Sequence, residues 1–541
     1  MTKIMEPFFP LALELPPRGS RKLLRTLHQQ LRAAILDGRL KPELRLPATR
    51  RAIACGPILA VARTIGIGRT PAEQFWNPRR PSGTRSESKI STCDSPAATR
   101  ELAAAMGVSR NIVIAAYEQL LSEGYVSARP GAGTYVANVL PQARRTIATD
   151  DASAESRLRR LSPFWRSPPA LPEPGEAMSF PFDFRIGLSD KTHFPYRVWR
   201  RLSARALRGI SRTPVAYADP AGQADLREAI ARHISLSRAV ACQAEDVVVT
   251  VGAQQGFDLL ARILVAPGQT VVATEEPGYP PSRAAFAAAG ARIVPVPVDE
   301  EGLAVERLPA RAGVILTTPS HQFPLGTVMS TPRRQALLQF ATAHRAVVIE
   351  DDYDGDFRYG GRPLDALQTL DGGRSVFYVG TFSKSLFPGL RLGFVVPPAW
   401  ARPALLAAKQ IADWHGPILA QDTLTAFIAE GHLARHIRRM RQVYGERRSI
   451  LLEALGRHCP DRLVPIAGEA GLHLAARLSG SVEAGAVVAA AAARGIKLQA
   501  LQGYAEKEER AANGLAFGLG LIEADRIDAG IRELAKAMRS A

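Results

Sequence analysis

Residues 380–393 combine a lysine with small hydroxyl residues and an arginine, in the order Gly-Thr-Phe-Ser-Lys-Ser-Leu-Phe-Pro-Gly-Leu-Arg-Leu-Gly. Lys384 offers an amine that can form a Schiff base with an aldehyde. Arg391, Thr381 and Ser383 offer the guanidinium and hydroxyl donors that a phosphate needs. Pyridoxal 5'-phosphate requires both kinds of group, so the segment favours this cofactor. The alternative is a solvated lysine in a Ser/Gly loop.

A second group of candidates follows a run of β-branched residues, Val-Val-Ile-Glu-Asp-Asp-Tyr-Asp at 347–354. The run predicts a buried strand, and α/β sheets place ligand groups at the carboxyl ends of their strands. Asp351 is our candidate for holding the pyridine nitrogen of the cofactor protonated, because opposite charges stabilise each other. Tyr353 could reach the phenolic oxygen. Helix capping or a solvated loop charge is the alternative role for these side chains.

Residues 247–260 read Val-Val-Val-Thr-Val-Gly-Ala-Gln-Gln-Gly-Phe-Asp-Leu-Leu, which predicts a strand, a glycine turn and the start of a helix. Free N–H groups at a helix N-terminus form a phosphate site. Gly252, Ala253 and Gln254 occupy that position. Many strand-turn-helix units bind nothing, but this one precedes the lysine by a distance that suits a large α/β domain.

These motifs, in this order, resemble those of the fold-type I aminotransferases, and the resemblance covers residues 179–541. It implies an α/β domain that binds pyridoxal 5'-phosphate. Within it we expect a large part at about 217–400 and a smaller α+β part at about 401–541.

Three further tyrosine and histidine positions resemble cofactor contacts of that family. Tyr217, in Tyr-Ala-Asp-Pro-Ala-Gly, matches the tyrosine that reaches the phosphate of the neighbouring subunit's cofactor. Tyr279, in Pro-Gly-Tyr, matches the aromatic residue that stacks on the pyridine ring. The segment 318–326, Thr-Pro-Ser-His-Gln-Phe-Pro-Leu-Gly, takes the place of Asn-Pro-Thr-Gly. The usual Asn is absent, so His321 or Gln322 would have to replace it. Ordinary packing is the alternative role for these side chains.

The first third of the chain predicts a different activity. Residues 20–38 show a helical period that ends at a glycine, with apolar residues at Leu24, Leu27, Leu31, Ala34 and Ile35. Residues 99–107 predict a capped short helix, and residues 107–121 a tight turn into a second helix, so the pair forms a helix-turn-helix. Residues 125–136 alternate around a Gly-rich turn, as a two-stranded wing would.

Ser109, Arg110 and Asn111 stand at the start of the second predicted helix, where recognition helices present side chains to the major groove of DNA. Arg110 can form two hydrogen bonds with guanine and Asn111 two with adenine, whereas Ser109 would contact a phosphate. An arginine at a helix start is otherwise usually a solvated charge.

The same region resembles the winged helix of GntR-type regulators, in Arg-Glu-Leu-Ala at 100–103 and in Gly-Val-Ser-Arg-Asn, Ala-Tyr-Glu-Gln-Leu and Gly-Ala-Gly-Thr-Tyr-Val. The resemblance implies that Arg100 faces DNA. The wing, with Gly131 and Gly133, would touch phosphate.

Charge supports this division of the chain. Residues 1–178 hold 26 Lys and Arg against 15 Asp and Glu, a net charge of +11 out of the chain's +18. A polyanion partner, double-stranded DNA, is the natural consequence, with an affinity that falls as salt rises. Basic surfaces also serve solubility or membrane contact, but the basic residues are scattered and no amphipathic lipid-binding segment stands out.

A chain of 541 residues can hold two or three domains with sizeable cores. It has no run of about twenty apolar residues to span a bilayer, and its start is broken by Glu and Pro, unlike a signal peptide. The cysteines, which form neither a zinc pattern nor a disulfide framework, are Cys55, Cys93, Cys242 and Cys459. We expect a cytoplasmic protein without a metal site or membrane partner.

The whole chain resembles the MocR/GabR family of bacterial transcriptional regulators. The resemblance implies a multidomain protein, with an α+β winged helix at 15–139, a flexible linker at 140–178 and the aminotransferase-like domain at 179–541. It also implies a head-to-tail homodimer in which Tyr217 completes the partner's site. The small-molecule effector is then pyridoxal phosphate itself or an amine that reacts with it.

Two segments depart from the family pattern, and the first lies in the DNA-binding part. After Leu-Pro-Ala-Thr-Arg at 46–50 the family continues with Glu-Leu-Ala, yet here fifty residues intervene, and Ala-Thr-Arg stands on both sides of them. We predict that 51–100 is an insertion, mostly disordered because it is rich in turn formers. Long surface loops cost little closure entropy, so helix formation survives. Whether DNA binding does is open, since the loop emerges near the DNA-facing edge.

The second departure concerns the ligand. The arginine that binds an amino-acid carboxylate usually stands in text like Leu-Arg-Leu-Gly-Phe, and here Gly514 takes its place in Asn-Gly-Leu-Ala-Phe-Gly-Leu. Without this arginine the site binds a carboxylate more weakly, unless Arg283 or another arginine compensates. This favours pyridoxal phosphate as effector, with a GABA-like or taurine-like amine as competitor. A working aminotransferase with a vestigial DNA-binding module is the alternative function.

Overall fold

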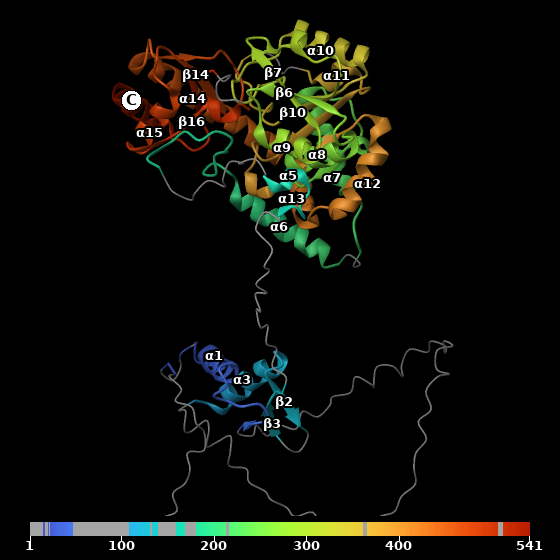
Figure 1. The fold of residues 1–541 in the computed structure, drawn as a ribbon, viewed down its shortest axis with the longest axis vertical. Coiled ribbons are helices and arrows are strands. Elements are labelled where there is room, and N and C mark those ends of the chain that lie inside the picture. The colour runs from blue at the N-terminus through green and yellow to red at the C-terminus, as the bar shows by residue number, and fades with distance from the viewer. Residues whose placement is uncertain are drawn as a thin grey trace, which may run out of the picture. The chain divides into compact units, whose positions relative to one another are not determined.

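The computed structural model describes residues 15–16, 20, 22–46, 108–129, 133–138, 158–167, 180–212, 216–360, 365–506 and 512–541. The chain divides into two compact units, residues 1–151 and 152–541 (Figure 1). The predicted insertion at 51–100, the helix expected at 99–107, and the DNA-binding candidates Arg100 and Gly131 lie outside the described residues.

In the first unit two helices pack on a shared apolar core. The helix predicted from the apolar period is α1 (Leu23–Leu36), and the predicted second helix is α3 (Arg110–Ser122). Gly38 follows α1 with a left-handed backbone, φ 80°, which suits the glycine that ends a helix. The core contains Leu27, Leu31, Ala34, Ile35, Val113, Ala116, Tyr117 and Leu120. Both helices are therefore confirmed.

The predicted wing is an antiparallel pair of strands. β2 (Val126–Arg129) pairs with β3 (Gly133–Val136), and β1 (Arg45–Leu46) pairs with the other edge of β3. At Gly133, φ is 114°, and an added Cβ would lie 3.1 Å from the guanidinium of Arg45. Glycine therefore leaves room for the Arg45 side chain beside β3.

The second unit is built on an eight-stranded sheet. Its strands β11, β10, β9, β6 and β7 run parallel, and most of their residues are buried, as expected for strands covered on both faces. In order across the sheet, the strands are β5 (Val248–Thr250), β12 (Gly393–Val396), β11 (Val376–Thr381), β10 (Val347–Asp352), β9 (Ala312–Thr317), β6 (Val271–Glu276), β7 (Arg292–Asp299) and β8 (Gly302–Leu303).

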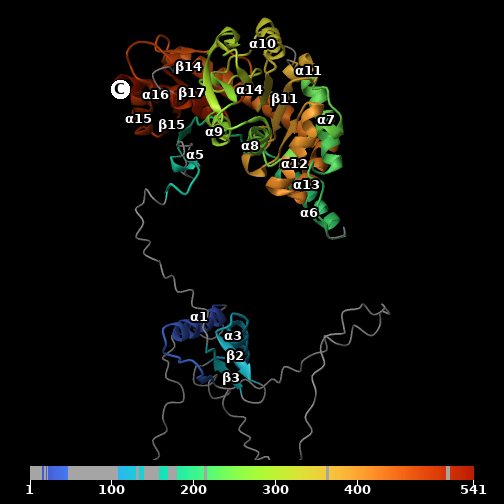
Figure 2. The same ribbon diagram turned by 45° about the vertical axis from the view of Figure 1, so that its right-hand side comes forward.

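Helices cover both faces of this sheet (Figure 2). One apolar cluster joins the sheet to α8, α9 and α12, and another joins the opposite face to α10 and α11. The helices of the unit are α5 (Pro163–Arg166), α6 (Tyr196–Ile210), α7 (Ala224–Arg238), α8 (Ala253–Leu264), α9 (Pro280–Ala288), α10 (Thr331–His344), α11 (Leu367–Asp371), α12 (Arg402–Asp413), α13 (Ile418–Ala429), α14 (His432–His458), α15 (Ala484–Ala492) and α16 (Ala524–Ser540).

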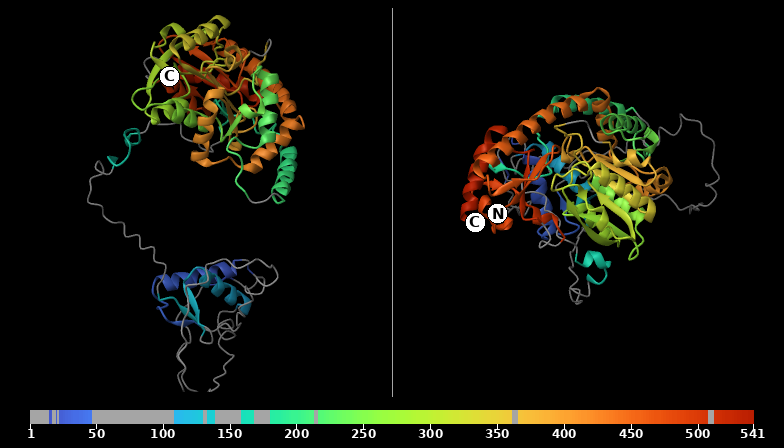
Figure 3. Two further views of the ribbon diagram at one scale, coloured as in Figure 1. Left: turned by 90° about the vertical axis from the view of Figure 1, so that its right-hand side faces the viewer. Right: turned by 90° about the horizontal axis from the view of Figure 1, so that it is seen from above.

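A smaller α+β part lies beside the large sheet, as the view from above shows in red (Figure 3). It combines α14, α15 and α16 with a four-stranded sheet of β13 (Leu463–Pro465), β14 (His473–Leu478), β17 (Gly514–Gly518) and β16 (Gln499–Ala500). β4 (Phe182–Asp183), near the start of the unit, pairs with β15 (Ile496–Lys497). The expected architecture of an α/β domain with a smaller α+β part is confirmed. Among the described residues, no helix has both the length and the apolar character needed to span a bilayer.

Candidate cofactor site

The phosphate candidates come together because of the register of three strands. Gly393 of β12 is paired with Thr250 of β5 on one side and with Thr381 of β11 on the other. The chain leaving β5 therefore meets the chain entering β12, at the same edge where β11 ends. This places Gly252 and Arg391 next to each other.

Gly252 caps α8 with a left-handed backbone, φ 76°. A Cβ at this position would lie 2.9 Å from Nη2 of Arg391, so any other residue would displace the guanidinium from its place at the helix N-terminus. Nη2 of Arg391 donates to the Val251 carbonyl at 3.0 Å. The N–H groups of Ala253 and Gln254 belong to the first turn of α8 and have no acceptor within the helix. The helix end and the guanidinium together form a cradle for an anion.

Lys384 stands in the tight turn after β11, three residues after Thr381. In this turn the Thr381 hydroxyl donates to the Ser383 hydroxyl at 3.0 Å. Nζ of Lys384 donates to the carbonyl oxygen of Gly187 at 2.6 Å. Burial lowers the pKa of the Lys384 amine, and the charge of Arg391 acts in the same direction against nearby carboxylates. The amine is therefore closer to its neutral, nucleophilic form than an exposed lysine.

The pleat of β10 separates its two aspartates, because neighbouring side chains of a strand point to opposite faces. Asp352 pairs with Arg238 at 2.5 Å and accepts from the Tyr378 hydroxyl at 2.5 Å. On the other face, Oδ1 of Asp351 is buried and has no hydrogen-bond partner within the described part of the chain. Burial raises the pKa of Asp351 to about 8, which Asp352 reinforces and Lys384 opposes. A protonated pyridine nitrogen would supply the missing donor and charge.

Tyr279 lies beside Asp351. It precedes α9, and it lines one cavity together with Asp351, Thr317 and Arg283. Its ring packs edge-on against Phe323, with the centroids 5.4 Å apart. The sequence motif thus brings an aromatic ring to the same pocket as the carboxylate.

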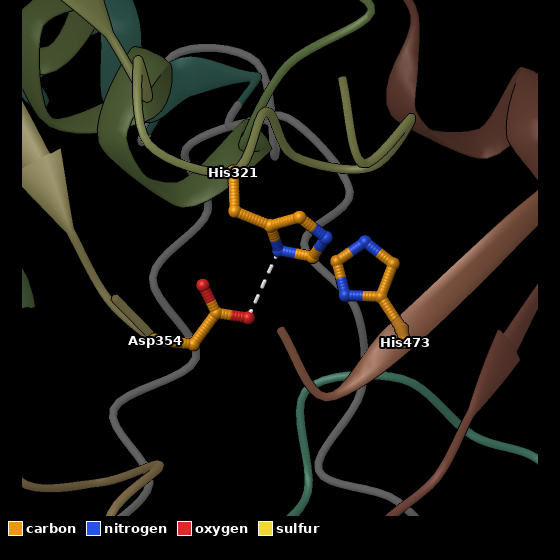
Figure 4. Close-up of side chains that lie close together, drawn as sticks. All are labelled: His321, Asp354 and His473. Carbon is orange, nitrogen blue, oxygen red and sulfur yellow. Dashed lines mark hydrogen bonds and ion pairs between the residues drawn. The ribbon is translucent and has the colours of Figure 1, made fainter. Parts of the chain in front are cut away.

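Three buried side chains, His321, Asp354 and His473, lie next to these groups (Figure 4), and the half-buried Tyr353 contacts them. Nδ1 of His321 lies 3.0 Å from Oδ2 of Asp354 and 2.9 Å from the hydroxyl oxygen of Tyr353. The ring of His473, from β14 of the smaller part, lies 4.6 Å from that of His321. His321 and Tyr353 were predicted from the sequence, whereas Asp354 and His473 were not. Asp354 is the last residue of the 347–354 motif that contains Tyr353. No spacing in the sequence connects His473 with this motif.

Gln322, the alternative to His321, has its amide group occupied. Its Nε2 donates to Oε2 of Glu275 at 3.1 Å and to the carbonyl oxygens of Pro277 and Phe323. Its Oε1 accepts from the N–H of Leu325. Gln322 therefore fastens the loop to β6, and His321 is the residue that faces Tyr353.

Tyr217 is an exposed side chain, with 76% of its surface accessible. Its ring lies 4.5 Å from that of Trp414, at the end of α12. The predicted contact of Tyr217 with a second subunit's cofactor stays a prediction, and its ring and hydroxyl are exposed on this subunit.

The strand β17 has no arginine at its first position, Gly514, or at its third, Ala516. At Gly514 an added Cβ would lie 2.5 Å from the carbonyl oxygen of Ala476, so that position has no room for a side chain. Ala516 projects from the same face and belongs to a buried apolar cluster with Phe323. Because Ala516 packs in the same cluster as Phe323 and Tyr353, position 516 is the one to compare with a carboxylate-binding arginine. Arg283 pairs instead with Glu276 at 3.4 Å.

Of the DNA-binding candidates that the structure describes, Gly133 begins β3 of the wing and the other three lie at one end of α3. Ser109, Arg110 and Asn111 are exposed at the helix N-terminus, while Val113 and Ala116 bury the opposite face. Ser109 makes no capping bond with its side chain. The helix therefore presents these three side chains to solvent, which is the arrangement a recognition helix needs.

Two family models match the chain. The model for aminotransferases of class I and II matches residues 187–504, and that for bacterial regulatory proteins of the gntR family matches residues 94–136. The probable rhizopine catabolism regulatory protein MocR of Rhizobium meliloti is 37% identical over 74% of this chain and 81% of the relative. The pyridoxine biosynthesis transcriptional regulator PdxR of Corynebacterium glutamicum is 32% identical over 81% of this chain and 90% of the relative.

The second unit also resembles solved aminotransferase structures. One is the α-aminoadipate aminotransferase LysN of Thermus thermophilus, solved in complex with N-(5'-phosphopyridoxyl)-L-leucine. It is 29% identical, with a TM-score of 0.61, over 66% of this chain and 92% of that structure.

Proposed function

Since the chain belongs to the MocR/GabR-type transcriptional regulators, which join a GntR-type DNA-binding domain to an aminotransferase-like domain, we propose that it binds pyridoxal 5'-phosphate at Lys384 and that this binding controls its affinity for DNA. The observation that carries the proposal is the juxtaposition of a partly buried amine, an unpartnered buried carboxylate and an anion cradle. The effector is pyridoxal phosphate itself or an amine that reacts with it.

The residues present fit the cofactor. The cradle of Arg391 and the α8 N-terminus would hold the phosphate, and Asp351 would hold the protonated pyridine nitrogen. Tyr279 would cover the ring, and Lys384 would bond covalently to the aldehyde carbon. Bound in this way, the cofactor supplies an electrophilic carbon that exchanges Lys384 for another amine.

A physical connection between the site and the N-terminal part of the unit supports regulation. Gly187 accepts from Nζ of Lys384, and the neighbouring Ser189 donates its hydroxyl to the Leu386 carbonyl at 3.0 Å. An ammonium has three N–H donors, and an amine bonded to an aldehyde carbon keeps at most one. Cofactor binding would therefore leave Lys384 with at most one hydrogen to donate to the segment through which the chain enters this domain. A ligand that changes contacts in this way can favour one arrangement of the chain over another.

Binding to DNA fragments from upstream of the protein's own gene tests the proposal. We expect the affinity or the protected region to change when pyridoxal phosphate is added to the wild type, and not to change for Lys384→Ala. The absorbance of the covalently bound cofactor, which the variant should lack, checks that the site was occupied.

Two results would argue against the proposal. If the DNA binding of a Lys384→Ala protein still responds to pyridoxal phosphate, covalent attachment at Lys384 is not needed for regulation. Sustained release of keto acid from a panel of amines would instead favour the alternative function, an active aminotransferase. Pyridoxal phosphate as sole effector predicts a response without any added amine, whereas a GABA-like or taurine-like effector predicts one only after the amine is added.

A further inference from the structure

The network around His321 has one consistent assignment of hydrogens (Figure 4). Oδ2 of Asp354 accepts from the N–H of Leu472 at 3.2 Å and also lies 3.0 Å from Nδ1 of His321. An ionised carboxylate only accepts hydrogen bonds, and a ring nitrogen carries either one hydrogen or one lone pair. Nδ1 of His321 therefore carries the hydrogen and donates it to Asp354.

This assignment fixes the role of Tyr353. Nδ1 of His321 already bears a hydrogen, so the Tyr353 hydroxyl, 2.9 Å away, cannot donate to it and can only share, as an acceptor, the hydrogen that Nδ1 donates to Asp354. Burial raises the pKa of Tyr353 well above its ordinary value, so the hydroxyl keeps its own hydrogen. That hydrogen points away from His321 and is available to another acceptor.

On the basis of the proposed function, we propose that Asp354 is a positioning residue for the cofactor. Through His321 it turns the Tyr353 hydroxyl into a donor to the phenolic oxygen of bound pyridoxal phosphate. It thereby sets the pH at which the Lys384 nitrogen, once bonded to the cofactor, loses its proton.

The surroundings hold this arrangement in place. At Gly471 an added Cβ would lie 2.0 Å from Cε1 of His321 and 2.6 Å from Oδ2 of Asp354, so the backbone packs directly on the pair. Burial lowers the pKa of His473 to about 3, and its Nε2 lies 3.0 Å from the Pro324 carbonyl oxygen, so this ring is a neutral neighbour.

Other charged groups also lie near Tyr353. The carboxylates that act on its hydroxyl, besides Asp354, are Asp351, Asp352 and Glu275. Lys384 is the cation that Asp351 and Asp354 both face. Of the four carboxylates, Asp354 is the one bonded to the ring nitrogen that lies next to the Tyr353 hydroxyl.

A metal ion is the competing use of the cluster. His321, Asp354 and His473 offer ligand atoms that all lie within 4.8 Å of one another. Nδ1 of His321 and Oδ2 of Asp354 are already hydrogen-bonded to each other, so neither atom is free to bind a metal ion. This favours a proton network.

The test is a pH titration of the full-length, cofactor-loaded protein, followed by the absorbance of the bound cofactor. Tyr353→Phe removes the donor, and Asp354→Asn removes the charge that holds the hydrogen on His321. A hydrogen bond to a charged group contributes about 1.5–3 kcal/mol, and donation to the phenolic oxygen favours the deprotonated form. We therefore expect the midpoint of the absorbance change to rise by about one to two pH units in each variant.

The double variant distinguishes positioning from general disturbance of the fold. If Asp354 acts through Tyr353, Asp354→Asn adds no further shift to Tyr353→Phe. The matched control is Asp356→Asn, two residues further on, whose carboxylate faces His233 at 3.5 Å and should leave the midpoint unchanged. Should Asp354→Asn not fold, His321→Leu removes the intervening donor and is expected to give the same upward shift.

Three results would overturn the inference: an unshifted midpoint in Asp354→Asn, additive shifts in the double variant, or spectra that depend on added zinc and are reversed by a chelator. Failure of the proposed function has a different signature, because the wild type would then show no absorbance of cofactor bonded to Lys384.

Discussion

The surroundings of Asp351 disfavour the ionised form of its carboxyl group. Oδ1 of its carboxyl group is buried without a hydrogen-bond partner in the described structure, and burial raises its pKa to about 8 from the ordinary 3.8. The folded protein therefore binds this proton more tightly than the unfolded chain. The resulting stability is fully present below about pH 4 and is lost as the pH rises toward 8. A protonated pyridine nitrogen would remove this cost.

We expect Asp351→Asn to make the cofactor-free protein less sensitive to alkaline pH. Between about pH 5 and about pH 8 the melting temperature of the wild type should fall more than that of the variant, because the variant has no carboxyl group to ionise. The variant should also bind pyridoxal phosphate at least about tenfold more weakly, since it lacks the charge for the pyridine nitrogen. Thermal unfolding and equilibrium titration measure the two effects. An identical pH dependence in both proteins would contradict this account.

At the scale of elements, the cradle depends on one turn between β5 and α8. Gly252 has a left-handed backbone, and its missing Cβ makes room for Arg391. The helix N-terminus and the guanidinium meet only because β12 lies between β5 and β11 in the sheet. The geometry of the phosphate site is therefore a property of strand order as much as of residue type.

Gly252→Ala should weaken binding of pyridoxal phosphate by about tenfold or more, because Cβ displaces the guanidinium in addition to straining the backbone. Gly268→Ala is the matched control: φ is 75°, and nothing lies within 4 Å of an added Cβ. It should lose a similar amount of stability, about 1–2 kcal/mol, without losing affinity. Titration of the absorbance and thermal unfolding separate the two effects. Equal affinities in the two variants would show that Arg391 does not need the space.

At the scale of the whole molecule, the site and the DNA-binding helix belong to different compact units of one chain. The basic N-terminal third and the candidate cofactor site therefore fold in separate units, and only the chain between them joins the two covalently. Tyr217, exposed on its own domain, is the residue through which a second subunit is expected to act. A head-to-tail dimer and a cytoplasmic location stay predictions.

Mixed dimers test the shared site. Tyr217→Phe should weaken binding of pyridoxal phosphate, and Lys384→Ala should abolish its covalent attachment. When the two variants are assembled together at equal amounts, one site in each mixed dimer has both native side chains, so about a quarter of all sites should regain wild-type affinity. Spectroscopic titration counts these sites. No gain over the Tyr217→Phe protein alone would mean that each subunit builds its own site.

The DNA-binding part can be tested independently of the cofactor. The segment 51–100 interrupts the motif that resembles GntR-type regulators. If it hinders contact with DNA, its deletion should increase affinity for the operator and leave cofactor absorbance unchanged. Electrophoretic mobility shifts at several salt concentrations measure the change, because phosphate contacts weaken as salt rises. Equal affinity with and without the segment would identify it as a tolerated insertion.

The sequence by itself determined the local chemistry and the architecture. The lysine turn, the strand that ends in Asp351, the glycine before α8 and the period of α1 are short-range patterns, and local backbone preferences are enough to read them. The order of these motifs also identified the two domains and the family.

Only the tertiary structure decided which of these groups meet. Strand pleat and neighbours assigned Asp351 to the site and Asp352 to Arg238, and a full set of hydrogen bonds removed Gln322 as the alternative to His321. His473 and the carbonyl of Gly187 came from far along the chain. Residue spacing does not encode such long-range contacts, because they depend on how the sheets pack and not on any local conformational preference.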